Sequence, residues 1–443
     1  MRIPLGEAAR WLDARLVSDN PDAASVVARN VSYDSRSILP DELFVAVVAQ
    51  RDGHDFVDAA GLAGAAAVLV SREIPNCRVP QIVVADTGAA LTSLGAWARR
   101  EMAPRVAGRV VGITGSVGKT TTKDFIAAAL SARYVVGASE KSLNNDQGVP
   151  VTLLNAPDDA AAVVVEMGMR GFGEIARLAT LVQPDIAVIT RVGEAHSERV
   201  GGIEGVAQAK GELVRAIGPL GSAVLNADDH RVAAMVKLTP GRSFTYGTAD
   251  DAHMRIDNIA IANGNGIAFT YDSEWGSGSC RLPVPGAHMA MNAAAALLVA
   301  ALCGVSLGDA AAALAESRMS PMRMAVHHIA NATLLDDTYN ASPTSVIAAL
   351  ETVASLPGTS RVAVLGVMAE VDNAPAEHRR VVQRATELGI RVVAYGTDLY
   401  GTEVIDTYEQ VASFVSRLPD GAVVLLKGSR VAGLDQAVRL VLG

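Results

Sequence analysis

The stretch Gly112-Ile-Thr-Gly-Ser-Val-Gly-Lys-Thr-Thr-Thr122 lies between an apolar run that begins at Arg109 and an Ala-rich helical pattern over residues 124–130. A strand, a glycine turn and a helix in this order form a cradle for phosphate, because backbone N–H groups and the helix N-terminus point at the anion. Lys119 would reach the β- and γ-phosphates of a nucleotide, and the Thr120 hydroxyl would bind magnesium. The alternative is a glycine-rich turn in which Lys-Thr follows by chance.

The spacing of this loop departs from the usual one. In G-x-x-x-x-G-K-[ST] the first glycine would fall on Ile113, whereas Gly112 stands one place earlier. The order of strand, glycines, Lys-Thr and helix is still the order that phosphate binding requires. The predicted nucleotide contacts of the loop are Gly115, Ser116, Val117, Gly118, Lys119, Thr120 and Thr121.

Length and charge exclude several classes of protein. A chain of 443 residues is too long for a single core. Its formal charge of −9 argues against a nucleic-acid surface, which needs a basic face. The three cysteines lie far apart without C-x-x-C pairs, so neither a disulfide framework nor a zinc site is predicted.

The N-terminus lacks the pattern of a signal peptide, and the apolar residues 293–305 are too few to span a membrane. We therefore expect a cytoplasmic protein.

The pattern of elements predicts an α/β protein in three segments, residues 1–107, 108–319 and 320–443. In the first, short strands alternate with helices up to a hinge at Ala103-Pro104. The second begins with the phosphate loop, and its alternation of strands and helices indicates a mainly parallel sheet with ligands at the carboxyl ends of the strands. Residues 243–282 are more polar and glycine-rich, which predicts an antiparallel excursion.

The third segment has the pattern of a dinucleotide-type fold. Four apolar runs separated by helical sequence predict strands at residues 334–337, 361–366, 391–396 and 422–427. It contains no G-x-G-x-x-G, so we assign it no nicotinamide site.

Short runs spread over all three segments form a common pattern. They are Tyr33-Asp-Ser-Arg36, the phosphate loop, Asn144-Asn-Asp-Gln-Gly-Val-Pro150, Glu166-Met-Gly168, Ala195-His196, Ala209-Lys-Gly-Glu212, Leu225-Asn-Ala-Asp-Asp229, Asp336-Asp-Thr-Tyr-Asn340 and Lys427-Gly-Ser-Arg430. Together they resemble the ATP-dependent muramyl ligases, in the family's order. The resemblance implies a small N-terminal UDP-binding domain, a central domain with a P-loop ATPase-like parallel sheet, and a C-terminal domain that resembles a dinucleotide fold.

The activity that this resemblance implies is the addition of D-alanyl-D-alanine to a UDP-linked muramyl tripeptide in peptidoglycan synthesis. ATP would convert the tripeptide carboxylate into an acyl phosphate, and the dipeptide amine would displace phosphate. Because phosphoryl transfer is mostly positioning and charge neutralisation, the site needs cations and metal ligands more than a nucleophile. ATP and Mg²⁺ are the expected cofactors, the two substrates are the expected partners, and a monomer is expected.

Magnesium ligands are assigned by the same resemblance. The resemblance implies a magnesium ion that neutralises phosphate charge. Its ligands would be Thr120, Glu166 and His196. Taken alone, a Glu at a strand end could be an ordinary solvated terminus, and a lone His is more often structural.

Lys210 matches a lysine that the family carbamylates, and the resulting anion would hold a second magnesium. Carbamylation requires a desolvated lysine with a lowered pKa. The alternative is a lysine on a helix surface, paired with Glu204 or Glu212. With Lys119, His196 and Arg323, Lys210 completes the predicted catalytic set.

The nucleotide would also contact the third domain. The resemblance places adenine, ribose or phosphate near Asn292, Asp337, Tyr339 and Asn340. Arg323 matches an arginine that reaches toward the γ-phosphate, and its alternative is a surface salt bridge. The chain departs from the family at Met289, where an Asn is common after the His, and at Val367, where an Asp is frequent.

Polar and charged side chains are the candidates for substrate binding. The predicted residues are Ser35, Arg36, Asn144, Asn145 and Asp146 for the UDP end, and Lys427 and Arg430 for the dipeptide. An Asx-rich turn explains the run that begins at Asn144 nearly as well.

Two kinds of rival interpretation are open. A sister ligase that adds one amino acid, or a folylpolyglutamate-type enzyme, would use the same scaffold. A nucleotide-binding switch or transport ATPase would keep Lys119 and Thr120 but would not need Lys210, Asp337 or a third α/β domain.

Overall fold

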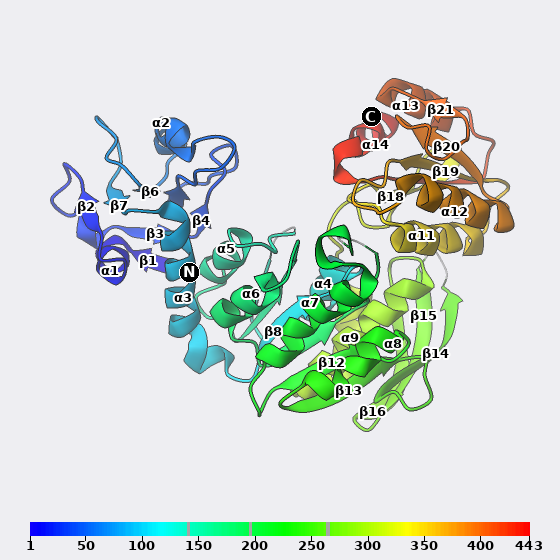
Figure 1. The fold of residues 1–443 in the computed structure, drawn as a ribbon, viewed down its shortest axis with the longest axis horizontal. Coiled ribbons are helices and arrows are strands. Elements are labelled where there is room, and N and C mark those ends of the chain that lie inside the picture. Colours follow the sequence, from blue (N-terminus) through cyan, green and yellow to red (C-terminus); the bar gives the residue numbers. More distant parts are fainter. Residues whose placement is uncertain (140–141, 195–196, 263–265) are drawn as a thin grey trace. The chain divides into compact units, whose positions relative to one another are not determined.

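The computed structural model describes residues 1–139, 142–194, 197–262 and 266–443. It divides into two compact units, of which the first contains Met1–Gly112, Arg133–Gly168 and Ile175–Ile186, and the second contains Ile113–Ala132, Met169–Glu174 and Ala187–Gly443. Both are mixed α/β structures with parallel strands, which confirms the predicted fold class (Figure 1). The domain boundaries at 107/108 and 319/320 stay a prediction.

The first unit is built on a five-stranded sheet with the order β2-β7-β6-β5-β4. Its strands are β2 (Arg15–Val17), β4 (Val31–Ser32), β5 (Leu43–Val45), β6 (Ala67–Val70) and β7 (Gln81–Val83). All are parallel except β2, which is antiparallel to β7. Phe44 and Val68 of the sheet pack against Val57 of helix α2 (Val57–Leu62).

Helix α3 (Thr87–Val106) follows the sheet. It begins at Asp86, whose carboxylate accepts hydrogen bonds from the N–H groups of Gly88 and Ala89, at 2.7 and 3.0 Å. The helix continues through Pro104, so the predicted hinge at Ala103-Pro104 is wrong. Met102 and Val106 are buried, and this packing holds the last turn although the proline donates no hydrogen bond.

The first unit also contains strands from the middle of the chain. They are β9 (Val136–Ala138) and β10 (Ala162–Glu166), which are parallel, with helix α5 (Gly148–Leu154) between them in the chain. Strand β8 (Val110–Thr114) passes from the first unit into the second and leads directly into the phosphate loop.

The second unit begins its sheet with parallel strands and ends it with antiparallel ones. After β11 (Ile186–Ile189), the strands of this sheet are β12 (Ser222–Asn226), β13 (Arg242–Gly247), β14 (Met254–Ile261), β15 (Ile267–Ser273) and β16 (Gly276–Leu282). Antiparallel pairing starts only at β14, because β13 is parallel to both of its neighbours. The predicted excursion from Ser243 therefore began too early. The hydroxyl of the buried Tyr246 donates to the carbonyl of Ile189, at 3.1 Å, which ties β13 into the parallel part.

The Ala-rich sequence after the excursion forms helix α9 (Ala287–Leu302), which is buried for most of its length and packs against α4 (Lys119–Ser131). Of the helices in the described ranges, none combines the length and the apolar character needed to cross a bilayer.

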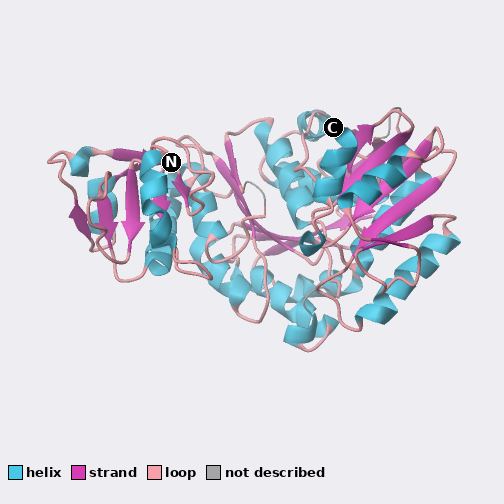
Figure 2. Cartoon of the chain, turned by 90° about the horizontal axis from the view of Figure 1, so that it is seen from above, coloured by secondary structure: helices cyan, strands magenta, loops and turns pink. Residues whose placement is uncertain are grey.

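A second sheet of this unit has the order β17-β18-β22-β19-β20-β21. Its strands are β17 (Ala325–His328), β18 (Ala332–Asp337), β19 (Arg361–Gly366), β20 (Arg391–Tyr395), β21 (Val404–Ile405) and β22 (Ala422–Lys427). The four predicted strands are confirmed, and all pairs except β17 with β18 are parallel. Helices flank the sheet on both faces (Figure 2).

One of these faces shows how the strands bury alternate residues. It is covered by α13 (Tyr408–Ser416) and α14 (Asp435–Leu442), where Val415 and Val438 meet Val424. The register places Asp337, the last residue of β18, directly opposite Lys427, the last residue of β22.

Candidate active site

The phosphate loop needs glycine at two positions. Gly118 ends the loop with φ +84° and precedes the first residue of α4. A side chain there would be strained, and its Cβ would lie 2.8 Å from the amide oxygen of Asn292. At Gly115 a Cβ would overlap the hydroxyl of Thr190. Both glycines thus let neighbouring groups approach the loop closely, and Asn292 lies beside the loop.

Residues that follow strand β11 (Ile186–Ile189) hold the rest of the loop in place. The Ser116 N–H donates to the carbonyl of Arg191, at 2.7 Å, and the Thr190 hydroxyl donates to the carbonyl of Val117, at 2.6 Å. The Ser116 hydroxyl is within hydrogen-bonding distance of both the carbonyl and the N–H of Gly193, at 3.1 and 2.9 Å. These hydrogen bonds hold the loop in place, and the first N–H groups of α4 are directed to one place.

This close approach leads to a first prediction. We expect Gly115→Ala to raise the KM for ATP and to lower stability by about 1–3 kcal/mol, because the methyl group overpacks against Thr190. Gly308→Ala is the matched control, since no heavy atom lies within 4 Å of a Cβ built there. Thermal melts and steady-state kinetics would check both variants. Equal stability and equal KM in the two variants would contradict the prediction.

Three predicted catalytic and cofactor residues meet at this loop. The Lys119 ammonium donates to the carbonyl of Gly115, at 2.8 Å. Arg323 donates from Nη2 to the hydroxyl of Thr120, at 2.8 Å, and its guanidinium lies over the ring of Tyr339, with 4.2 Å between the guanidinium carbon and the ring centroid. The structure thus places two cationic side chains, one from the loop and one from the sequence after residue 320, beside the predicted phosphate position.

Lys210 lies in helix α7 (Ile203–Ala216), and its residue is only 3% exposed. Burial lowers the pKa of its amine well below the usual value, and the nearby Lys119 cation lowers it further. The surface alternative does not hold, because Glu204 pairs with Arg231, at 2.6 Å, and Glu212 accepts from the N–H of Gly173, at 2.7 Å. Burial of this kind favours the neutral amine.

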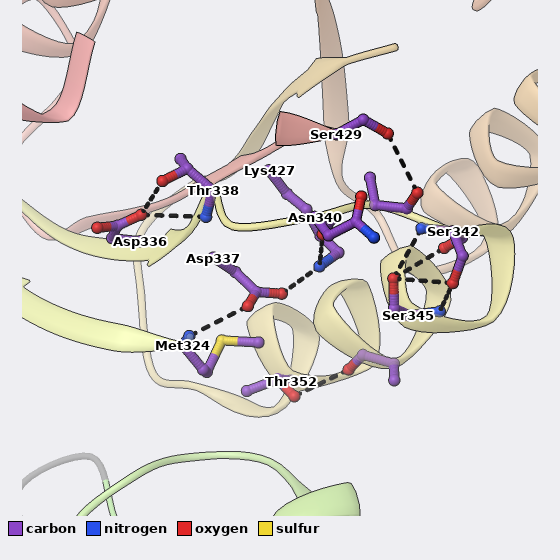
Figure 3. A network of polar contacts seen from close by, with 12 residues as sticks. Met324, Asp336, Asp337, Thr338, Asn340, Ser342, Ser345, Thr352, Lys427 and Ser429 are labelled. Atoms are coloured by element: carbon purple, nitrogen blue, oxygen red, sulfur yellow. Dashed lines mark hydrogen bonds and ion pairs between the residues drawn. The ribbon is translucent and has the colours of Figure 1, made fainter. Parts of the chain in front are cut away.

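The end of the second sheet carries the other predicted contacts of this unit. Lys427 is buried and forms an ion pair with Asp337, and its ammonium also donates to the carbonyl of Asn340, at 2.9 Å (Figure 3). Arg430 is exposed and pairs with Asp435, at 3.0 Å. The sequence predicts nucleotide contact for Asp337 and dipeptide contact for Lys427, and it does not predict that they pair. The available signal was that both residues end predicted strands.

The remaining candidates lie in the first unit. Glu166 is buried at the end of β10 and accepts from the Asn144 amide, at 2.8 Å. The Asn145 side-chain oxygen accepts from the N–H of Gln147, at 3.2 Å, which is the contact of an Asx turn, and also from the N–H of Gly148, at 2.9 Å. Asp146 pairs with the exposed Arg177, at 2.7 Å.

The loop after β4 carries the two other candidates of the first unit. Arg36 is exposed and forms a bidentate pair with Asp34, at 2.8 and 2.7 Å. Its neighbour Ser35 is partly buried in the same loop.

The sequence predicts ligands for two magnesium ions. His196 lies outside the described residues. Across the described ranges, no group of three or more His, Cys, Asp and Glu side chains forms a metal cluster. The predicted ligands of the first magnesium are the Thr120 hydroxyl, the Glu166 carboxylate and His196, and a modified Lys210 is the predicted ligand of the second.

Comparison with known proteins is consistent with this picture. Residues 113–300 match the Mur ligase middle domain, and residues 322–430 match the Mur ligase, glutamate ligase domain. The UDP-N-acetylmuramoyl-tripeptide--D-alanyl-D-alanine ligase of Escherichia coli (strain K12) is 35% identical over 432 residues, which cover 94% of each chain. The enzyme of that name from Synechocystis sp. (strain ATCC 27184 / PCC 6803 / Kazusa) is 32% identical and covers 100% of this chain and 98% of its own.

Solved structures show the same similarity. MurF from Acinetobacter baumannii superposes with a TM-score of 0.85 at 28% identity, covering 100% of this chain and 99% of that chain. MurF ligase from Thermotoga maritima, solved in complex with ADP, gives a TM-score of 0.79 at 27% identity, over 94% and 97% of the two chains.

Proposed function

The chain belongs to the Mur ligase family and is an ATP-dependent ligase that adds D-alanyl-D-alanine to the UDP-N-acetylmuramoyl tripeptide in peptidoglycan synthesis; we propose the following roles for its residues. The observation that carries these roles is the meeting of Lys119, Thr120 and Arg323 at the phosphate loop.

The reaction needs two displacements. A carboxylate oxygen of the tripeptide attacks the γ-phosphorus of ATP, so that a carboxyl O–P bond forms while the bond to the ADP oxygen breaks. The dipeptide amine then attacks the carbonyl carbon, a C–N bond forms, and the C–O bond to phosphate breaks with loss of a proton from nitrogen. Inorganic phosphate and ADP are the leaving groups. Both steps gain mainly from positioning and from compensation of phosphate charge.

In this proposal the loop and its neighbours perform the first step. N–H groups of the loop and of the first turn of α4 hold the phosphates, and Lys119 turns from the Gly115 carbonyl to the β- and γ-phosphates. Arg323 compensates the charge that develops on the transferred group. Magnesium, held by Thr120 with Glu166 and His196, would supply further charge neutralisation to the phosphates.

We propose that Lys210 is carbamylated. The buried position and lowered pKa of this amine fit the requirement that nitrogen be neutral when it attacks carbon dioxide. A bond forms between the lysine nitrogen and the carbon of carbon dioxide, and the π electrons of one C=O bond become a lone pair on oxygen. The nitrogen then gives a proton to solvent, which leaves a carbamate anion. The side chain then carries a negative charge that compensates the Lys119 cation and offers oxygen ligands to a second magnesium.

We assign the two substrates to different sets of residues. Ser35, Arg36 and Asn144 would bind the UDP end, and Asn145 and Asp146 would support that loop. Arg430 would meet the carboxylate of the dipeptide, because an exposed guanidinium can bind it through two parallel hydrogen bonds. ATP and a UDP-linked intermediate are metabolites of the cytoplasm, which favours that location.

The test is an assay of phosphate release from ATP with each substrate supplied singly and together. We expect release only when the UDP-tripeptide and D-alanyl-D-alanine are both present. Release with a single amino acid in place of the dipeptide would point to a sister ligase. Release with a folate and glutamate would point to the folylpolyglutamate type, and release without any acceptor would point to a simple ATPase.

Arg430 supplies a second prediction. We expect Arg430→Met to raise the KM for D-alanyl-D-alanine by roughly 10-fold, the effect of losing one charge-assisted contact. The KM values for ATP and for the UDP-tripeptide should stay within a few fold. Steady-state kinetics with each substrate varied in turn would measure this. An unchanged dipeptide KM would remove Arg430 from the dipeptide site.

A further inference from the structure

Arg323 lies in a backbone segment of unusual conformation. Met322 and Met324, its two neighbours, have φ angles of +62° and +54°. Residues other than glycine rarely adopt this left-handed region, and they keep it only where surrounding contacts hold them. The segment that aims Arg323 at Thr120 is therefore held from outside.

Asp337 and Tyr339 provide those contacts. The Asp337 carboxylate accepts from the N–H of Met324, at 3.2 Å, and the Tyr339 N–H donates to the carbonyl of Met322, at 3.2 Å. The ring of Tyr339 also supports the guanidinium of Arg323. One short turn thus fixes the residue before Arg323, the residue after it, and its side chain.

Lys427 in turn holds both ends of that turn. Its ammonium pairs with the second oxygen of the Asp337 carboxylate and donates to the carbonyl of Asn340, so it spans the turn from first residue to last (Figure 3). The parallel register of β18 and β22 brings the two side chains together. The Lys427 side chain is 3% exposed and the Asp337 side chain 17%, so solvent screens the pair weakly.

We propose that Lys427 is a positioning residue for phosphoryl transfer: through Asp337 and the turn up to Asn340 it holds Arg323 against the phosphate loop. This role rests on the proposed function of Arg323 and replaces the predicted role of Lys427 in dipeptide binding. A buried ammonium that already has a carboxylate partner is poorly placed to bind another carboxylate. Arg430, three residues later, also pairs with a carboxylate, that of Asp435, but its side chain is exposed and a guanidinium has five N–H donors, so it can still bind the dipeptide.

The two roles differ in the step that they affect. Phosphoryl transfer can be followed without the dipeptide by positional isotope exchange, in which a labelled β,γ-bridging oxygen of ATP scrambles while the acyl phosphate forms and reverts. We expect Lys427→Met to slow this exchange roughly 10²-fold, which is the effect of a small displacement of a catalytic group. The KM for D-alanyl-D-alanine should stay within a few fold.

A double variant separates positioning from general damage. Because Lys427 acts through Arg323, adding Lys427→Met to Arg323→Met should slow the exchange by no more than a few fold beyond Arg323→Met alone. Lys237→Met, which changes an exposed lysine, is the control for the substitution itself and should leave the exchange unchanged. If Lys427→Met does not fold, the pair Lys427→Met with Asp337→Leu carries the same test, since it leaves no unpaired buried charge.

Two results would overturn the proposal. One is normal isotope exchange in Lys427→Met together with a raised KM for the dipeptide, which would restore the substrate role. The other is a double variant whose loss equals the product of the two single losses, which would make the residues independent. An unmutated protein without UDP-tripeptide-dependent exchange would instead contradict the function proposed above.

Discussion

Replacement of Lys119 by alanine is expected to nearly abolish turnover, with a loss on the order of 10³-fold or more, because the phosphate loop loses the cation that faces the β- and γ-phosphates. The affinity for the UDP-tripeptide should stay within a few fold. Lys119 lies in the second compact unit, whereas Ser35 and Arg36, the candidates for the UDP end, lie in the first. The loss should therefore concern phosphoryl transfer alone.

Phosphate release and calorimetric titration with the UDP-tripeptide would measure the two quantities on one preparation. Lys237→Ala is the matched control, because it removes an exposed lysine outside the loop. Tripeptide binding that collapsed together with turnover, in a protein with an unchanged melting temperature, would show that the assignment of the uridine site is wrong.

The phosphate loop could be predicted because its chemistry is local. The loop residues lie close together in the sequence, so their spacing alone indicates which groups can surround an anion. They are Gly115, Gly118, Lys119 and Thr120. The four strands of the last sheet could be predicted for a related reason. Each is an apolar run between helical sequences. Whether such a run forms a strand depends little on which other strand lies next to it in the sheet.

Neighbour relations could not be predicted in the same way. Lys427 and Asp337 are 90 residues apart, and they pair because β22 lies beside β18 in the sheet. The sequence placed both at strand ends but contained nothing local about strand order. The start of the antiparallel excursion was wrong for the same reason. The parallel pairing of β13 with β12 and β14 is a relation between strands that no local pattern in the sequence specifies.

Pro104 shows the converse error, where a local rule was given too much weight. A proline costs a helix one hydrogen bond, and the sequence suggested a hinge. The buried side chains of Met102 and Val106 outweigh that cost and carry α3 through the proline. Packing on the core, which sequence shows poorly, decided the end of the helix.

Burial is also what separates the two interpretations of Lys210. A lysine on a helix with Glu204 and Glu212 nearby has the sequence of a surface ion pair. The structure gives both carboxylates other partners and leaves the lysine buried. Among the residues that the structure describes, no carboxylate forms an ion pair with Lys210. A buried ammonium next to the Lys119 cation would be costly, and a carbamate removes that cost by reversing the charge.

We expect Lys210→Ala to lose on the order of 10²- to 10³-fold in turnover, the range found when one preorganised electrostatic contact is removed from an active site. A short carboxylate such as formate or acetate should restore part of the activity, because it can occupy the space of the missing side chain and return the negative charge. The same carboxylate should not stimulate the unmutated enzyme. Phosphate release at increasing carboxylate concentration would measure the rescue, with chloride at equal ionic strength as control.

The unmutated enzyme offers an independent measurement. Its activity should fall when carbon dioxide and bicarbonate are removed and return when they are restored, and ¹³C-labelled bicarbonate should yield a carbamate signal that is lost in Lys210→Ala.

The direction in which carbamate formation changes with pH follows from the pKa of the amine. Only the neutral amine reacts, and burial lowers its pKa, so the carbamate should form at pH values where an exposed lysine stays protonated and should be lost as the pH falls through the lowered pKa. Active enzyme without the ¹³C signal, together with a variant that no carboxylate restores, would show that Lys210 acts as an unmodified amine beside Lys119.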